Sequence, residues 1–149
     1  MKKKIMKIGF GLVVIFIAIQ FIPTARNEST ETLKSDFVVM FSPPKNIALK
    51  LKTACYDCHS NKTTYPWYNK IQPVAWFLEH HIEEAKEELN FSEFGNYSNR
   101  KQKSKLKSIK NEIKDAKMPL KSYTLMHKDA KFSKEEKEIM LKWLEKINN

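Results

Sequence analysis

The sequence contains only three glycines, and no long segment alternates between apolar and polar residues. The shortage of glycine excludes a collagen-like chain, and the missing alternation argues against half-buried β-strands. There is also no internal repeat and no low-complexity tract. With 42% apolar and 30% charged residues, the composition indicates an all-α globular protein. A length of 149 residues allows one compact domain with a short appendage, so we expect a single functional site.

A recognised nucleic-acid-binding motif is absent as well, although the formal net charge is +10. Four of the positive charges, on Lys2, Lys3, Lys4 and Lys7, lie at the N-terminus, and the remainder of the chain carries a net charge of +6. An excess of this size is typical of a solvated surface. We therefore expect no nucleic acid among the partners.

The four lysines precede an apolar run from Ile8 to Ile22 that only Gln20 interrupts. This pattern predicts a secretory signal or an N-terminal membrane anchor in residues 1–23. Cleavage after Ala25 would place Pro23 where signal peptidases prefer a small residue, so the A-x-A pattern is absent. Its absence favours an uncleaved anchor. The lysines would remain in the cytoplasm while the rest of the chain is exported. We expect a single-pass protein of the bacterial inner membrane with its domain in the periplasm, or an exported protein if the signal is cleaved.

The exported part divides into a polar tether over residues 24–36 and a helical domain over residues 37–149. Proline positions, capping residues and apolar spacing predict the helices of this domain. One helix is expected from Pro44 to the cysteines, a second from Pro73, a third over about residues 98–117, and a last one from Ser133.

The motif Cys55-Tyr56-Asp57-Cys58-His59 has the C-x-x-C-H pattern of covalent haem attachment. Two thiols at this spacing can each bond one vinyl group of a haem, and the next residue is then held beneath the iron as its proximal ligand. The motif therefore predicts haem c as cofactor, with Cys55 and Cys58 as attachment points and His59 as iron ligand.

Three other interpretations of the two cysteines are weaker. A thioredoxin-like dithiol needs a strand-helix-strand pattern, which a helical chain lacks. A structural zinc site needs four ligands, and no further histidine or carboxylate stands at a recognised spacing. A disulfide between residues three apart closes too small a loop to stabilise the fold much.

A six-coordinate haem iron needs a second axial ligand, for which Met118 is the first candidate. It lies in Met118-Pro119, between the third helix and the last one, and a thioether ligand would raise the reduction potential. His127 and His81 are the alternatives, and either would lower the potential relative to methionine. His81 lies on the apolar face of the second helix, where a histidine is more often a hydrogen-bonded core residue.

The combination of motifs resembles the short bacterial haem-binding domain proteins, found mainly among the Bacteroidetes. The resemblance runs through residues 55–61, 64–68, 71–76, 89–92, 118–120, 123–124 and 127–143, which cover most of the predicted domain. It implies an all-helical, cytochrome-c-like fold around one covalent haem, preceded by a membrane segment. The His80-His81 pair departs from many members, so the distal ligand stays open.

We expect a monohaem electron carrier that performs no substrate chemistry and is therefore not an enzyme. A small haem sensor or peroxidase is the alternative, and it would require a displaceable distal ligand. A membrane-attached assembly module with a structural haem is a third possibility. The sequence does not identify the redox partner protein.

Overall fold

The computed structural model describes residues 1–148, and these residues form helices and no strand. The α-helices are α1 (Lys2–Ile19), α2 (Phe37–Phe41), α3 (Lys45–Leu51), α4 (Asp57–His59), α5 (Val74–Glu88), α6 (Asn99–Lys114), α7 (Lys121–Met126) and α8 (Lys134–Asn148). A π-helical turn at Lys52–Tyr56 joins α3 to α4, and 3-10 turns lie at Trp67–Lys70, Phe91–Asn96 and Lys128–Ala130. The prediction of an all-α protein is confirmed for this part of the chain.

The four predicted helices correspond to α3, α5, α6 and α8. The helix expected to run from Pro44 to the cysteines continues past α3 through the π-helical turn into α4. The third helix ends at Lys114, three residues before the predicted end. Neither α2 nor α7 was predicted, because a helix of five or six residues is too short to display an apolar period.

The predicted N-terminal hydrophobic membrane segment is wrong. Residues Lys2–Ile19 do form a helix, but none of the helices in residues 1–148 is both long enough and apolar enough to cross a bilayer. The helix begins at Lys2, so its first two turns carry four lysines, and it ends at Ile19. The apolar part from Ile8 onward measures about 18 Å, whereas a bilayer core is about 30 Å thick.

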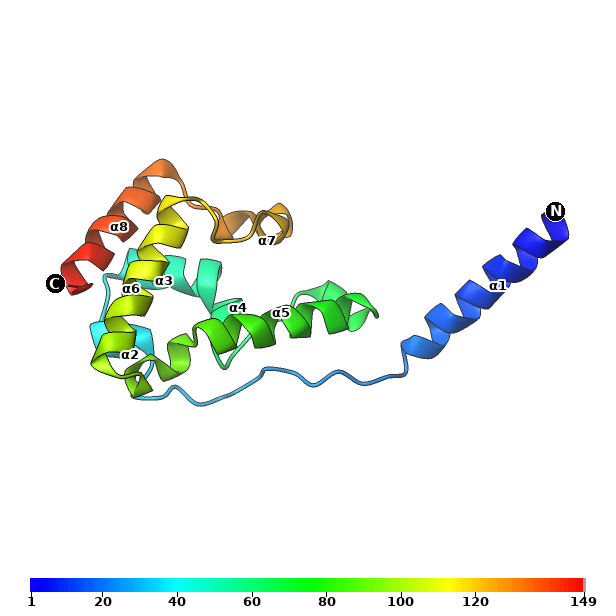
Figure 1. Ribbon diagram of the computed structural model, residues 1–149, viewed down its shortest axis with the longest axis horizontal. Helices are drawn as coiled ribbons and strands as arrows, with labels where there is room; N and C mark the ends of the chain where they lie inside the picture. The colour runs from blue at the N-terminus through cyan, green and yellow to red at the C-terminus, as the bar shows by residue number, and fades with distance from the viewer. Residues whose placement is uncertain (149) are drawn as a thin grey trace.

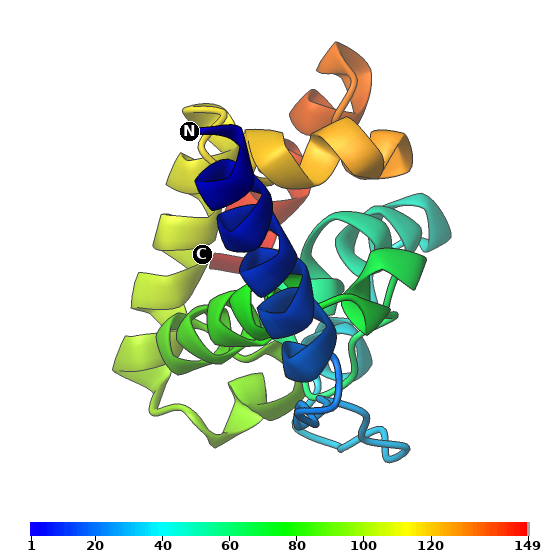
Figure 2. The same cartoon turned by 90° about the vertical axis from the view of Figure 1, so that its right-hand side faces the viewer.

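The remaining helices surround the C-x-x-C-H motif. In Figure 1, α5 runs below α4 and α7 lies above it, while α6 and α8 pack together at the end of the domain far from α1. Figure 2 looks from the side of α1 and shows α6 and α3 on opposite sides of α5. The motif thus lies between two layers, one formed by α5 and the other by α7 and the loop that precedes it.

The hydrophobic core lies directly beneath the motif. Phe37 is fully buried, and its ring lies 4.8 to 5.9 Å, centroid to centroid, from the rings of Phe41, Phe91, Phe94 and Trp143. The ring of Tyr56 stacks on Phe91 at 5.1 Å. Because aromatic pairs with this geometry resist displacement, the core fixes the orientation of the motif's helix.

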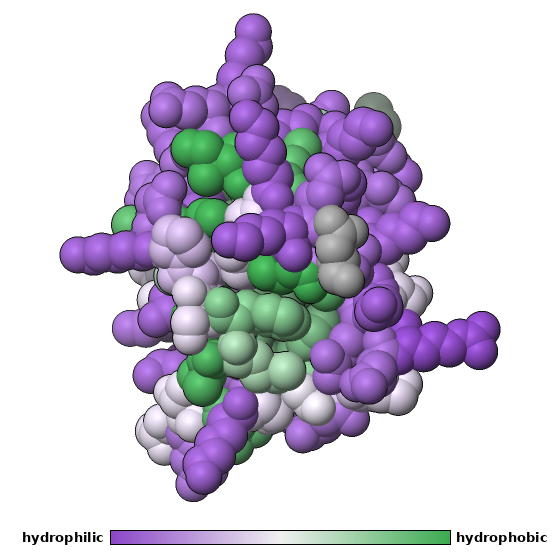
Figure 3. Space-filling view, turned by 90° about the vertical axis from the view of Figure 1, so that its left-hand side faces the viewer, coloured by the Kyte–Doolittle hydropathy of each residue, from purple (hydrophilic) through white to green (hydrophobic). Residues whose placement is uncertain are grey.

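The core also reaches the surface at the end of the domain opposite α1. Figure 3 shows that face, where apolar side chains lie exposed among longer charged ones. In α2, which belongs to this end, Val39 and Met40 are both exposed. This apolar area lies on a different side of the domain from the ends of α5 and α7 that approach α1.

The polar segment over residues 24–36 is hydrogen-bonded along the body of the domain. The Asn27 side chain donates to the Ser60 carbonyl at 2.7 Å and to Thr63 Oγ1 at 2.9 Å, and its backbone N–H donates to Tyr65 Oη. Farther along, Ser29 N–H donates to the Asn61 carbonyl at 2.8 Å. These contacts connect the segment to the residues that directly follow the motif.

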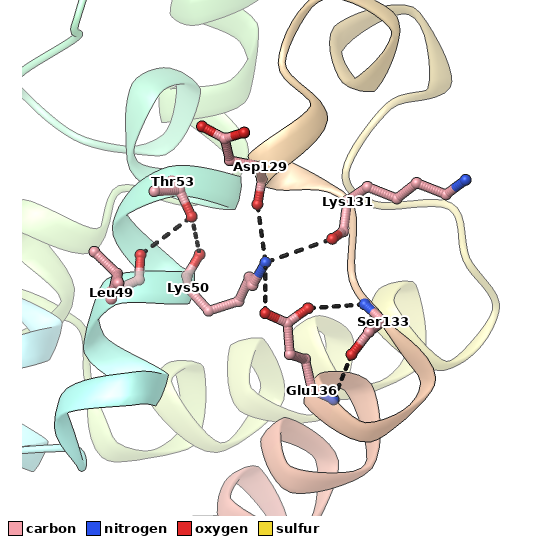
Figure 4. Close-up of polar contacts among 7 residues, drawn as sticks. All are labelled: Leu49, Lys50, Thr53, Asp129, Lys131, Ser133 and Glu136. Carbon is pink, nitrogen blue, oxygen red and sulfur yellow. Dashed lines mark hydrogen bonds and ion pairs between the residues drawn. The ribbon is translucent and has the colours of Figure 1, made fainter.

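Lys50 connects α3 to the loop before α8 (Figure 4). Its Nζ donates to the Asp129 carbonyl at 2.8 Å and pairs with Glu136 Oε1 at 2.9 Å. Glu136 also accepts from Ser133 N–H at 2.8 Å, while Ser133 Oγ accepts from Glu136 N–H. The predicted capping pair at the start of α8 is therefore confirmed, and it is joined to the helix that leads into the motif.

We predict that Glu136→Gln lowers the free energy of unfolding by about 1 kcal/mol at pH 7, since solvent screens the half-exposed pair. Ser133 N–H and then Lys50 lower the pKa of Glu136 below its ordinary value of 4.5. A lowered folded-state pKa stabilises the protein above the unfolded-state pKa, and this stabilisation is lost as the pH falls through the folded-state value. Urea unfolding should therefore show a smaller difference between the two proteins at about pH 3 than at pH 7. A difference that does not change with pH would contradict this assignment.

Candidate functional site

The C-x-x-C-H motif occupies the π-helical turn and α4. Cys55 lies in the turn, and Cys58 and His59 lie in α4. A π-helical turn widens the helix locally and often marks a functional site. The helix ends at His59, and the next residue, Ser60, is buried and has an extended backbone. Both thiols and the imidazole are half-buried and line a common cavity.

His59 is oriented by the backbone of α5. Its Nδ1 lies 2.9 Å from the Ala85 carbonyl oxygen and 3.1 Å from that of Leu89. Carbonyl oxygens accept hydrogen bonds, so Nδ1 carries the proton and Nε2 is the nitrogen available to a ligand. Burial lowers the pKa of His59, although the two carbonyls oppose this effect. The imidazole is therefore neutral at pH 7, as metal coordination requires.

Both cysteines are free, half-buried thiols. Burial raises the pKa of Cys55 to about 12, with a smaller contribution from Cys58, and it raises the pKa of Cys58 to about 11. Both thiols are therefore protonated at pH 7. A protonated thiol in apolar surroundings is a poor metal ligand and a poor participant in disulfide exchange, since both of those reactions use the thiolate.

A cleft runs past the motif and consists of three adjoining cavities. The inner cavity has a volume of about 370 Å³ and is lined by Cys55, His59, Leu89, Ile109 and Met118, among others. The outer cavity has a volume of about 360 Å³, and its lining includes Cys58, Tyr68, Phe77, His81 and Tyr123. A narrow cavity of about 60 Å³ joins them, because its lining includes both cysteines, His59, His81, Met118 and Tyr123. The cleft is thus an elongated slot with mainly apolar walls and the three reactive side chains of the motif along one of them.

Met118 lies in the loop that follows α6. The backbone leaves the helix at Ala116, whose φ of 54° is left-handed and strained for a residue with a Cβ. The Met118 N–H then donates to the Glu112 carbonyl at 3.2 Å. The side chain lines both the inner and the narrow cavity and is 37% exposed. The structure therefore brings together Cys55, Cys58, His59 and Met118, the four site residues predicted from the sequence.

The two alternative histidines have different positions. His81 lines the cleft, but it projects from α5 on the same face as Ala85 and Leu89, whose carbonyls orient His59. His127 is absent from the lining of all three cavities, and its Nε2 lies 2.9 Å from Tyr68 Oη. His80 is exposed and pairs with Glu84.

Charged side chains lie at the rim of the inner cavity. Lys105 and Glu88 form an ion pair there, and the hydrogen bond and charge of Lys105 lower the pKa of Glu88. Glu112 also lines this cavity. Apolar walls with a charged rim suit a flat, mainly apolar ligand with polar groups at its edge.

Several site residues could not be identified from the sequence. The Ala85 and Leu89 carbonyls are backbone groups, and only the helical spacing of α5 hinted that these residues face the motif. We also missed the contacts that bring Tyr68, Tyr123 and Asp57 together. Tyr123 and Asp57 are 66 residues apart, and a contact over that distance leaves no local sequence pattern. The high content of aromatic residues after the motif was the one available signal.

Comparison with known proteins gives one match. A family model described as a haem-binding domain matches residues 14–146, which is most of the chain. No curated protein and no solved structure matches.

Proposed function

The chain belongs to the haem-binding domain family, and we propose that it is a monohaem c-type protein that carries electrons. The observation that carries this proposal is the single cleft lined by Cys55, Cys58, His59 and Met118. Two thiols, an imidazole with an available Nε2 and a thioether are the donor set of a covalent, six-coordinate haem site. The residues present therefore fit haem c.

The cysteines would attach the haem by thiol addition. Each Sγ would form one thioether bond to a vinyl carbon of the haem, and the thiol hydrogen would pass to the neighbouring vinyl carbon. The step consumes no oxidant and leaves no charge on sulfur. The position of Cys55 in the inner cavity and of Cys58 in the outer cavity supports attachment at two points along the slot.

The haem iron would be held by His59 and Met118. Bound haem iron supplies a centre that gains and loses one electron. On the proximal side, the Ala85 and Leu89 carbonyls hold the His59 ring and fix its tautomer, as outer-shell partners of metal-bound histidines commonly do. Met118 would provide a thioether, which would favour the reduced state and so raise the potential.

Both histidine alternatives fit the distal position less well than Met118. His81 projects from α5, the helix whose Ala85 and Leu89 carbonyls also orient His59. His127 already uses Nε2 in its contact with Tyr68. Met118 comes from the loop after α6 and faces the inner cavity from another element.

We infer further that the protein is not an enzyme and that its partner is another redox protein, not a nucleic acid. The half-exposed Met118 keeps a small sensor or peroxidase as the alternative, since a displaceable distal ligand would admit a substrate. Export through an N-terminal signal, with the domain working in the periplasm, is also part of the proposal. The basic and then apolar order of residues 2–22 supports export.

Equilibrium redox titration of the haem-loaded protein tests the carrier role. We predict a reversible one-electron transition. Turnover of hydrogen peroxide should be no faster than that of a haem peptide that lacks Met118, because Met118 would occupy the distal position in the intact protein. Rapid saturable turnover of peroxide by the wild-type protein would favour the peroxidase alternative. Excess imidazole separates the carrier from the peroxidase, because it would occupy an open distal site and stop peroxide turnover there.

A further inference from the structure

Four polar and aromatic side chains form a connected group beside the outer cavity, two of which, Tyr68 and Tyr123, line it. Tyr123 Oη donates to Asp57 Oδ2 at 2.7 Å, and Asp57 is a residue of the motif itself. The Tyr123 ring stacks on His127 with centroids 4.2 Å apart and planes 9° from parallel. His127 Nε2 in turn lies 2.9 Å from Tyr68 Oη. We call Asp57, Tyr123, His127 and Tyr68 the clamp.

The clamp joins three separate parts of the chain. Asp57 belongs to α4, Tyr123 to α7 and Tyr68 to the 3-10 turn at Trp67–Lys70. Asp57 is itself fixed, because its Oδ1 accepts from Thr64 N–H at 3.1 Å and its carbonyl accepts from Thr63 Oγ1 at 2.6 Å. Tyr123 is therefore bonded to a rigid acceptor, and the clamp can hold α7 in place.

The loop that contains Met118 is short and is fixed at both ends. At its start, the Met118 N–H is bonded to the Glu112 carbonyl at the end of α6. After its end, Tyr123 is bonded to Asp57, and both Tyr123 and Met118 line the narrow cavity. The loop has strained backbone at Ala116 and few buried side chains, so the second attachment limits how far Met118 can move out of the cleft.

We propose that Tyr123, through its bond to Asp57 and its stack on His127, is a positioning residue that keeps Met118 in the distal ligand position. This inference rests on the proposed function, because it requires Met118 to bind iron. It assigns His127 a role in holding the distal loop in place of one as a ligand. Loss of the Tyr123 hydroxyl would free the loop to open without removing any of the four proposed haem-binding side chains.

Imidazole binding to the ferric, haem-loaded protein tests the proposal, because imidazole can bind iron only after Met118 has moved away. The hydroxyl of Tyr123 donates to a carboxylate, which is among the stronger hydrogen bonds in proteins. Tyr123→Phe should therefore raise the apparent affinity for imidazole and the rate of its binding about tenfold. His127→Phe retains a ring for the stack and should keep the sulfur–iron absorption band.

Tyr65→Phe is the matched control. It also removes a hydroxyl that donates to a carboxylate, Glu79 Oε2 at 2.9 Å, but Tyr65 lies outside the lining of the three cavities. Imidazole binding to this variant should stay within about twofold of the wild type, even if its unfolding midpoint falls by as much as that of Tyr123→Phe. If Tyr123 had only a structural role, Tyr123→Phe and Tyr65→Phe would change imidazole binding to the same extent, and that outcome would overturn the proposal.

The wild-type spectrum distinguishes the two ways in which the idea can fail. If the wild-type ferric protein has the sulfur–iron band and Tyr123→Phe binds imidazole as slowly as the wild type, the positioning role is wrong and the proposed ligand stands. If His127→Phe loses the band while Tyr123→Phe keeps it, His127 binds the iron itself and the role that the proposal gives it is wrong. If the wild type lacks the band, the assignment of Met118 falls and the positioning role falls with it.

Discussion

The double substitution Cys55→Ala, Cys58→Ala is expected to abolish covalent haem attachment completely. Each thiol lines the cleft and forms one of the two proposed thioether bonds. Without them, haem would be held by axial ligation alone and would be lost on denaturation. Once the haem is lost, the empty slot beside the core should also lower the unfolding free energy by about 3–5 kcal/mol, similar to a large truncation in a hydrophobic core.

Tyr56→Phe provides a control within the same motif. It removes the hydroxyl that donates to Asp36 Oδ1 at 3.0 Å but leaves both thiols and His59 unchanged. Its cost should be about 1 kcal/mol, with full covalent haem content. Haem staining of the three proteins after denaturing electrophoresis measures the difference. Equal staining of the double variant and the wild type would show that Cys55 and Cys58 are not the sites of haem attachment.

Met118→Ala is expected to remove the sulfur–iron absorption band and leave the haem covalently attached. Loss of the thioether should lower the reduction potential by on the order of 100 mV, because a thioether ligand stabilises the reduced iron relative to the oxidised iron. The iron should become open to small ligands, and peroxide turnover should rise. Spectroscopy and potentiometry of the purified haem-loaded variant measure both effects.

Met126→Ala serves as the matched control for this substitution. Met126 is another methionine near the same loop, but it lines only the outer cavity and is 60% exposed. Its replacement should leave the sulfur–iron band and the potential unchanged. A Met118→Ala spectrum identical to that of the wild type would show that another side chain, such as His81, is the distal ligand.

The helices were predictable from the sequence wherever a long apolar period or a capping pair was present. The spacing in residues 74–89 predicted α5, and Ser133 with Glu136 predicted the start of α8, because both patterns follow directly from helix geometry. The C-x-x-C-H spacing predicted that Cys55, Cys58 and His59 would lie together, and they line one cavity. Local rules of this kind need no knowledge of the rest of the chain.

The remaining features depended on contacts between distant residues or on exact helix ends. The sequence could not place α7 against α4, since the bond between Tyr123 and Asp57 joins residues 66 apart. It could not show that His127 contacts Tyr68, and so His127 was weighed as a ligand. The membrane segment was wrong because the apolar run was measured without knowing that the helix begins at Lys2 and ends at Ile19.

The most direct test of the account is the intact mass of the denatured protein together with its visible spectrum, after expression in a bacterium that ligates haem to exported proteins. We predict a mass equal to the polypeptide plus one haem, and a haem spectrum that stays with the polypeptide after extraction with acidified solvent. A colourless polypeptide with the mass of the bare chain would contradict the account.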